Sequence, residues 1–351
     1  MRINVVYDRW PHHAKRSGYP LIAQALARHV DVRRLGPSHP RVVPRRLTWW
    51  MVARAGGKPG YDPRAAAREV AVASRMAVGL HEICHFLYAE RDFRFAAAMS
   101  PCRRGAIVCT YHEADEHFHW TVPEQGHIAS ADAVVVVSEY QAHMLRETVP
   151  AARVHVVPLG IDTAYYRPGP EEGSPRAIFV GEHGRDFDAL VDVAKRCREI
   201  DPEFCLEVIS AADRAAELSK LPNVIARSGV SDEELVRSYR RADLLLLPFV
   251  SSTANNALLE GMSCGLPVIA SDVGGVRDYV DTDCAVLVAP GDAQRMARAV
   301  LDLMRDRSRL EQMALASRRR ALHFDWSRVA ERMLAVYRGA LSTRDARRRF
   351  R

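Results

Sequence analysis

The sequence lacks several features that would place the chain in a well-defined class. No run approaches the roughly 18–20 apolar residues that a membrane-spanning helix needs. The start, MRINVVYDRWPHH, turns polar after Val6 and has no apolar stretch like that of a signal peptide. The seven cysteines are scattered and include no CxxC pair, which is typical of reduced thiols. We therefore expect a cytoplasmic protein, with peripheral contact at the inner membrane face left open.

A dinucleotide-binding fingerprint is missing too, because no strand-like run is followed by G-x-G-x-x-G. The chain does contain His81-Glu82-Ile83-Cys84-His85, which spells the HExxH signature of zinc proteases. That chemistry requires a helix and a third ligand, whereas ICHFLYAE favours a strand and no HxxGxxH continuation follows. We expect no metal site, and we expect His81 and His85 at the end of a strand near a cleft wall.

Length and charge leave several classes open. With 351 residues and 48% hydrophobic composition, two domains with ordinary packed cores are expected. The formal net charge of +7 comes mainly from arginine, in runs such as 318–320 and 347–349. A basic excess attracts nucleotides, nucleic acid or acidic lipid, but it also occurs in enzymes from arginine-rich proteomes. We expect no nucleic-acid partner.

Strand-like and helical segments alternate along the chain, which predicts an α/β fold with parallel strands. Expected strands are 1–7, 30–35, 106–110, 133–138, 154–158, 177–181, 206–210, 244–248 and 268–271, and expected helices include 186–197, 232–241 and 256–264. Segment 158–175 is rich in Pro and Gly, as linkers are, and the pattern of strands and helices starts again on both sides of it. We predict domains at 1–164 and 165–325, doubly wound and facing across a cleft, and a C-terminal helix with a basic tail at 326–351 that crosses back to the first domain.

The segment 244–280, LLLLPFVSSTANNALLEGMSCGLPVIASDVGGVRDYV, carries the clearest chemistry. It predicts strand, turn, helix, turn and strand, with the helix beginning near Asn255 and Asn256. Asparagine caps a helix start, and the free amides there can hold phosphate. Glu260, one turn further on, is placed to accept hydrogen bonds from vicinal hydroxyls, although a local structural role is equally consistent with the sequence alone.

The same segment resembles the donor-binding segment of the retaining GT-B glycosyltransferases of family 4, also called group 1. VHVVPLGIDTAYYRP, AIFVGEHGRDFDALVDVAKR, GVSDEELVRSYRRADLLLLP and FDWSRVAERMLAVY are similar to further segments of that family. The likeness is specific over 154–337 and looser over the first half. It implies a GT-B fold of two Rossmann-like domains.

The resemblance also implies sugar transfer from a nucleotide-sugar donor with retention of anomeric configuration and no metal or other cofactor. Carried over by position, Glu260 would bind the donor ribose, and Asn255, Asn256 and Ala257 would hold sugar and phosphate. His112 would contact the donor sugar near the reacting centre. Gly18 would let the first domain approach the phosphates when the cleft closes.

Two features depart from the family pattern, at three positions. Ser252 stands where the first Glu of E-x7-E would grip the donor sugar, and a serine or Asn255 could replace that function. Glu182 and Phe187 stand where the phosphate-binding Arg and Lys would be. Arg185, in the same loop, is the predicted replacement, and a surface arginine is the alternative.

The acceptor is open among a glycan, a lipid-linked molecule and a small molecule. Residues 44–58, PRRLTWWMVARAGGK, fit contact with an anionic membrane, or equally a helix whose tryptophans pack under the cleft. Two other functions stay possible at this stage. One is another GT-B activity, such as a sugar-nucleotide epimerase or phosphorylase, and the other is a catalytically weak protein that binds nucleotide sugars or polyanions.

Overall fold

The computed structural model describes the chain except for residues 9–15, 36–42, 57–59, 171–176 and 350–351. Contacts divide the chain into two units. Unit 1 comprises Met1–His13, Tyr19–Pro158 and Trp326–Arg351, and unit 2 comprises Ala14–Gly18 and Leu159–Asp325. In the structure, the main boundaries between the units fall after Pro158 and after Asp325. The boundaries predicted from the sequence fall after residues 164 and 325.

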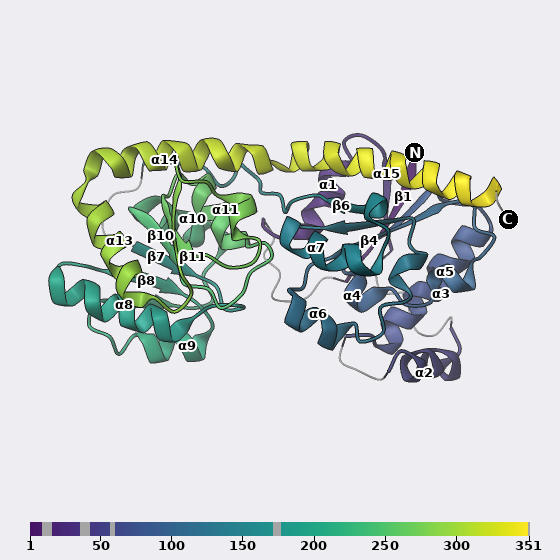
Figure 1. The fold of residues 1–351 in the computed structure, drawn as a ribbon, viewed down its shortest axis with the longest axis horizontal. Helices are drawn as coiled ribbons and strands as arrows, with labels where there is room; N and C mark the ends of the chain where they lie inside the picture. The colour runs from purple at the N-terminus through teal and green to yellow at the C-terminus, as the bar shows by residue number, and fades with distance from the viewer. Residues whose placement is uncertain (9–15, 36–42, 57–59, 171–176, 350–351) are drawn as a thin grey trace. The chain divides into compact units, whose positions relative to one another are not determined.

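Unit 1 is built on a parallel sheet whose described strands follow the order β2-β1-β3-β4-β5-β6. The strands are β1 (Arg2–Val6), β2 (Asp31–Leu35), β3 (Ile83–Phe86), β4 (Ala106–Tyr111), β5 (Ala133–Val136) and β6 (Val154–Val156). The helices are α1 (Ile22–Leu26), α2 (Arg45–Arg54), α3 (Pro63–Ala77), α4 (Ala89–Asp92), α5 (Ala96–Met99), α6 (Asp115–Thr121), α7 (Glu139–Thr148) and α15 (Trp326–Arg349), with short 3₁₀ turns at Tyr19–Leu21, Ile128–Ser130 and Ala151–Arg153. The last helix, α15, packs against α1, β4 and β5 of this unit (Figure 1).

Unit 2 is built on a second parallel sheet, with the order β12-β11-β10-β7-β8-β9. Its strands are β7 (Ala177–Val180), β8 (Leu206–Ile209), β9 (Val224–Arg227), β10 (Leu244–Leu247), β11 (Val268–Ser271) and β12 (Ala285–Val288). Its helices are α8 (Phe187–Ile200), α9 (Ala212–Leu218), α10 (Asp232–Arg241), α11 (Asn256–Ser263), α12 (Val276–Tyr279), α13 (Ala293–Arg305) and α14 (Arg307–Ala321), followed by a 3₁₀ turn at Leu322–Phe324. Helices α8 and α13 pack together on one layer, and α11 packs against α14 (Figure 1).

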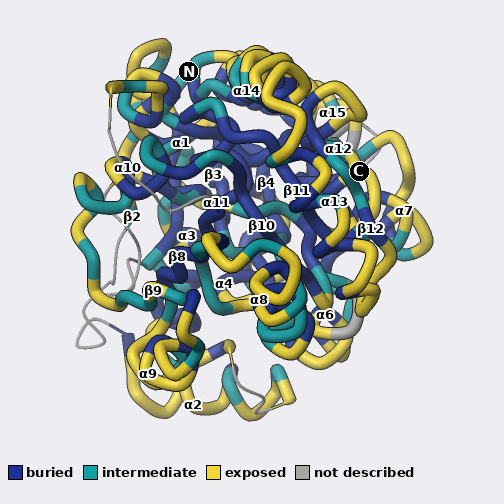
Figure 2. Tube along the Cα trace, turned by 90° about the vertical axis from the view of Figure 1, so that its left-hand side faces the viewer, coloured by how far each residue is buried: buried dark blue, intermediate teal, exposed yellow. Residues whose placement is uncertain are grey.

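The inner strands form because their side chains are mostly apolar on both faces, as helix-covered parallel sheets require, whereas the edge strands β2 and β9 are partly exposed. All four leucines of β10 are fully buried, and Figure 2 shows β10, β11, β3 and β4 in the colour of buried residues. Local signals set the helix starts. Asp186 caps α8 by accepting the amide of Ala189 at 2.9 Å, and Ser231 and Glu234 form a capping box on α10. The predicted doubly wound α/β organisation of both halves is confirmed.

The Pro- and Gly-rich segment that the sequence suggests as a linker is, in its described first part, fixed to unit 2. The backbone amide of Leu159 donates to the Tyr279 hydroxyl at 2.9 Å. Arg318 donates to the carbonyls of Thr163 and Tyr166 at 3.0 and 2.9 Å. Arg320, in the same arginine run, donates to the Tyr279 carbonyl at 3.0 Å. Two arginines of this run therefore bind backbone carbonyls within unit 2.

Each sheet reverses its strand order at one place. In unit 1 the chain places β2 on one side of β1 and β3 on the other, and in unit 2 it places β8 and β10 on opposite sides of β7. In open α/β sheets, ligands bind outside the carboxyl ends of the strands at such a point. Among the described helices, none is long and apolar enough to cross a membrane.

Candidate functional site

In unit 2, two loops meet at the point where the strand order reverses. One follows β7 and the other follows β10. Their backbones pair through Arg185 and Phe249, through the Asp186 amide on the Pro248 carbonyl at 3.0 Å, and through the Val250 amide on the Gly184 carbonyl at 2.9 Å. The second loop leads directly into α11, so this pairing fixes the start of that helix.

Gly184 is required for this close approach. Its φ of +68° lies in the left-handed region that side chains other than glycine disfavour. A methyl group at this position would also overlap the carbonyl oxygen of Ser251 in the facing loop. The glycine therefore serves both the turn and the contact between the two loops.

Arg185 lies buried beneath these loops, with only 9% of its surface exposed. Its Nε and Nη2 donate to the Val180 carbonyl at 3.1 and 2.7 Å, and its Nη1 donates to the His183 carbonyl at 3.1 Å. Its Nη2 also donates to Asn255 Oδ1 at 3.2 Å. Burial lowers the pKa of Arg185 to about 10, so the guanidinium stays positive near neutral pH. Arg185 thus organises both loops, and its direct contact with a donor phosphate stays a prediction.

The start of α11 matches the prediction. Asn255 is the N-cap, and its Oδ1 accepts the Leu258 amide at 3.1 Å as well as the Arg185 guanidinium. Asn256 is the first helical residue and is exposed, whereas Ala257 is buried. Helix geometry leaves the amides of the first turn without intrahelical acceptors, so Asn256 and Ala257 present donors that favour an anion.

Glu260 lies one turn further along α11, with 4% of its surface exposed. Its Oε2 accepts the Tyr239 hydroxyl at 2.8 Å. Burial raises the pKa of Glu260, and the hydroxyls of Ser17 and Tyr239 partly offset that effect. No local sequence pattern pointed to Tyr239 or Ser17, because both come from segments distant from α11 in the chain. Gly18 follows Ser17 with a φ of +102°, and this segment belongs to unit 2.

The three positions that depart from the family pattern each have defined contacts. Ser252 is 9% exposed, and its carbonyl accepts the Gly275 amide at 2.9 Å. Glu182 turns toward β8 and α9, where its Oε2 accepts the Ser210 hydroxyl at 2.5 Å and the Ala211 amide at 3.2 Å. Phe187 begins α8 and packs in a T-shaped contact with Phe179, with ring centroids 5.5 Å apart. Neither replacement supplies a positive charge.

His112 lies in unit 1, directly after β4. Its Nε2 is 2.7 Å from the Leu87 carbonyl, which fixes this nitrogen as the donor. The imidazole packs edge-on against Tyr19, with ring centroids 4.5 Å apart, and against Tyr88 at 4.9 Å. Burial lowers the pKa of His112 to about 4, so the ring is neutral near pH 7.

The HExxH string does not form a helix. Its residues 83–85 lie in β3, as the residue composition predicts. His85 is fully buried and lies next to the last residue of β3, so its predicted place at a strand end is consistent with the structure, and its position near a cleft wall stays a prediction. His81, just before β3, is 7% exposed. In the described ranges, no three His, Cys, Asp or Glu side chains are grouped as metal ligands.

Comparisons with known proteins now identify the family. Residues 174–306 match the family described as Glycosyl transferases group 1, and residues 21–165 match Glycosyltransferase Family 4. D-inositol 3-phosphate glycosyltransferase of Nocardia farcinica (strain IFM 10152) is 31% identical over 258 residues, which is 65% of this chain and 57% of that protein. The chain belongs to the group 1 and family 4 glycosyltransferases. It spans less than two thirds of the length of the curated relatives it matches.

Solved structures confirm the fold of this glycosyltransferase. Sucrose-phosphate synthase (tll1590) from Thermosynechococcus elongatus superposes with a TM-score of 0.72 at 17% identity, covering 97% of this chain and 99% of that one. Anabaena Alr3699/HepE in complex with UDP and glucose gives a TM-score of 0.68 at 15% identity, covering 95% and 98%. The predicted GT-B class, with two Rossmann-like units, is therefore confirmed.

Substituting Gly184 tests whether the paired loops build a nucleotide-binding site. Gly184→Ala should weaken nucleotide binding at least about tenfold, because the new methyl group forces the two loops apart. Gly229→Ala is the matched control, since Gly229 has a similar φ of +63° and no heavy atom within 4 Å of an added Cβ. Calorimetric titration with nucleoside diphosphates measures both variants. Equal losses of affinity would show that backbone strain alone, and not the loop contact, accounts for the effect.

Proton titration tests the environment of His112. Its imidazole resonances should stay constant from about pH 8 to about 5 and move only near the folded pKa of about 4. The unfolded ring binds its proton near pH 6.5, so this histidine makes folding less favourable as pH falls between those two values. NMR of histidine-labelled protein measures the midpoint. A midpoint near 6.5 would contradict a desolvated ring.

Proposed function

We propose that this chain transfers a hexosyl group from a nucleotide-sugar donor to a hydroxyl group of an acceptor, with retention of the anomeric configuration. Family membership supports sugar transfer. The complex of the Anabaena protein with UDP and glucose supports a nucleotide-sugar donor. The acceptor is a glycan, a lipid-linked molecule or a small molecule, and we place the reaction in the cytoplasm.

The observation that carries the proposal is the arrangement of α11 at the reversal point of the unit 2 sheet. The capped helix start presents the amides of Asn256 and Ala257, which suit a diphosphate. Glu260 lies one turn along the same helix, oriented by Tyr239, and its carboxylate suits the vicinal hydroxyls of a ribose. In unit 1, Nε2 of the neutral His112 ring donates to the Leu87 carbonyl, so the other ring nitrogen, Nδ1, would accept a hydrogen bond from the donor sugar.

We propose that the reaction needs no metal ion. The departing diphosphate would be stabilised by the α11 dipole and by the buried positive charge of Arg185, which lies against the N-cap of that helix. Because the guanidinium is held out of water, its field is screened less than that of a surface arginine. The positive charge of Arg185 would act on the diphosphate without direct contact, even though the N–H groups of the guanidinium bind protein carbonyls and Asn255.

A second candidate function is a protein that binds nucleotide sugars with little turnover. Ser252 supplies no carboxylate for the donor sugar, and four hydrogen bonds already occupy the Arg185 guanidinium. Polyanion binding through the arginine run 318–320 is less favoured, because Arg318 and Arg320 donate to backbone carbonyls.

Donor hydrolysis and transfer separate these candidates. Incubation with UDP-, GDP- and dTDP-sugars should give slow release of sugar from one donor, in the same anomeric form, and a chelator should leave the rate unchanged. Glu260→Gln should lower kcat/KM about 10- to 100-fold by weakening charge-assisted hydrogen bonds to the donor, whereas Glu203→Gln on the exposed surface should not. NMR of the released sugar measures both rate and configuration. Binding without any product would favour the second candidate, and loss of activity with chelator would refute the metal-free mechanism.

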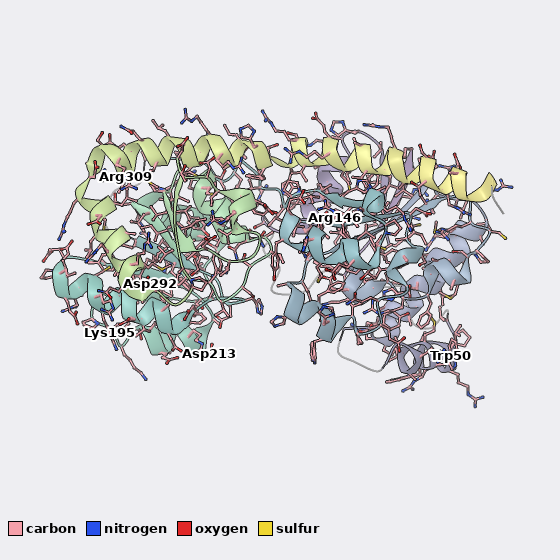
Figure 3. All side chains as sticks on the ribbon, viewed as in Figure 1. Trp50, Arg146, Lys195, Asp213, Asp292 and Arg309 are labelled. Carbon is pink, nitrogen blue, oxygen red and sulfur yellow. The ribbon has the colours of Figure 1, made fainter. Side chains whose placement is uncertain are left out.

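We also propose that unit 1 contacts a membrane surface through α2. From the sequence alone, the tryptophans of α2 could be either buried or exposed. In the structure, Trp49 and Trp50 are 52% and 59% exposed. Figure 3 labels Trp50 on this helix. The helix carries Arg45, Arg46 and Arg54 and no acidic residue, and in the described part of the chain no carboxylate pairs with these arginines. Aromatic rings flanked by unpaired arginines suit an interface with anionic headgroups.

Vesicle binding tests this contact. Replacing both tryptophans, Trp49→Ser with Trp50→Ser, should reduce co-sedimentation with anionic vesicles about tenfold or more, because two interfacial rings are lost. Trp120→Ser is the matched control, since Trp120 on α6 is 56% exposed. Binding to anionic vesicles should also fall with salt and be weak for zwitterionic ones. An equal loss in the control, or no binding by the unchanged chain, would exclude α2 as a membrane contact.

A further inference from the structure

A chain of polar side chains runs through the interior of unit 1. The Tyr337 hydroxyl on α15 is 2.7 Å from His85 Nδ1 on β3. His85 Nε2 is 2.7 Å from the Thr110 hydroxyl on β4, and that hydroxyl is 3.3 Å from the hydroxyl of Tyr19. His85, Thr110 and Tyr337 are fully buried, and Tyr19 is 3% exposed. The four groups thus connect the C-terminal helix to the sheet and to the turn after Gly18.

The network is complete only with a neutral imidazole. Burial lowers the pKa of His85 to about 3, so the ring has one donor and one acceptor nitrogen over the physiological range. It can then accept from one hydroxyl and donate to the other. Removing one hydroxyl from this dry environment leaves a buried nitrogen or oxygen without a partner, which is costlier than losing a solvent-exposed hydrogen bond.

The chain of contacts ends at His112. Thr110 lies near the carboxyl end of β4, two positions before His112, so its hydrogen bonds hold the end of the strand that leads into His112. Tyr19, bonded to Thr110, packs its ring edge-on against the imidazole of His112. Tyr88 and the Leu87 carbonyl contact the same imidazole. The His112 ring is therefore linked to α15 through a continuous series of contacts between buried side chains.

We infer that Tyr19, His85 and Tyr337 are positioning residues, through which α15 fixes the orientation of the His112 ring. This inference rests on the proposed function only for its effect on catalysis. None of the three has to touch a substrate for this role. The second histidine of the HExxH string thereby gains a function unrelated to a metal.

The experiment combines variants of Tyr337 and His112. Tyr337→Phe should lower kcat about five- to tenfold, leave KM for the donor unchanged and shift the His112 ring resonances, because the ring loses its fixed orientation. In a His112→Ala background, the same substitution should change kcat less than about twofold, since no ring remains to be positioned. Tyr140→Phe, on the exposed surface of α7, is the matched control and should change neither quantity.

Several outcomes distinguish this inference from the proposed function. An equal loss of kcat in both backgrounds, or unmoved His112 resonances in folded Tyr337→Phe, would overturn the positioning role. If His112→Ala alone leaves kcat unchanged, the proposed role of His112 fails, whereas shifted resonances would still support the positioning. Tyr19→Phe removes the hydroxyl at the other end of the network and keeps its ring, so it provides the same test should Tyr337→Phe not fold.

Discussion

The architecture of the candidate donor site depends on one buried cation between two loops. Arg185 binds carbonyls of its own loop and the side chain that caps α11, so a single guanidinium sets the distance between the carboxyl ends of β7 and β10. The backbone pairing of Arg185 with Phe249 and the glycine at 184 make this approach possible. The start of α11, and with it Glu260, follows from that constraint.

The same constraint explains how the chain tolerates its unusual residues. Where the family pattern would place a charged arginine directly after the strand, Glu182 instead ties the end of β7 to Ser210 and Ala211. The positive charge comes from Arg185, three residues further on and beneath the surface. A buried charge keeps its strength in salt, but it cannot reach out to a ligand as a surface side chain does. In the proposed function, the helix amides would therefore hold the diphosphate, and the guanidinium would act on it through its electric field.

Local patterns predicted the parts of the fold and site that depend on neighbouring residues. The apolar run of β10, the asparagine cap and the spacing to Glu260 are all contained in one short segment, and each was found as expected. Contacts between distant segments gave no such signal: His85 and Tyr337 are separated by 252 positions. The strand at the HExxH string was predicted from its residue types, but the partners of its second histidine depend on tertiary packing and not on the spacing of the motif. Exposure of the α2 tryptophans also required the structure, since both alternatives fit the sequence.

The most direct test of the donor site is a crystal structure of the chain with a bound nucleoside diphosphate. We expect the diphosphate within hydrogen-bond distance of the Asn256 and Ala257 amides, with the ribose hydroxyls on Glu260 and no divalent ion bridging the phosphates. A nucleotide bound away from the start of α11, or a metal ion coordinated between its phosphates and protein carboxylates, would contradict it.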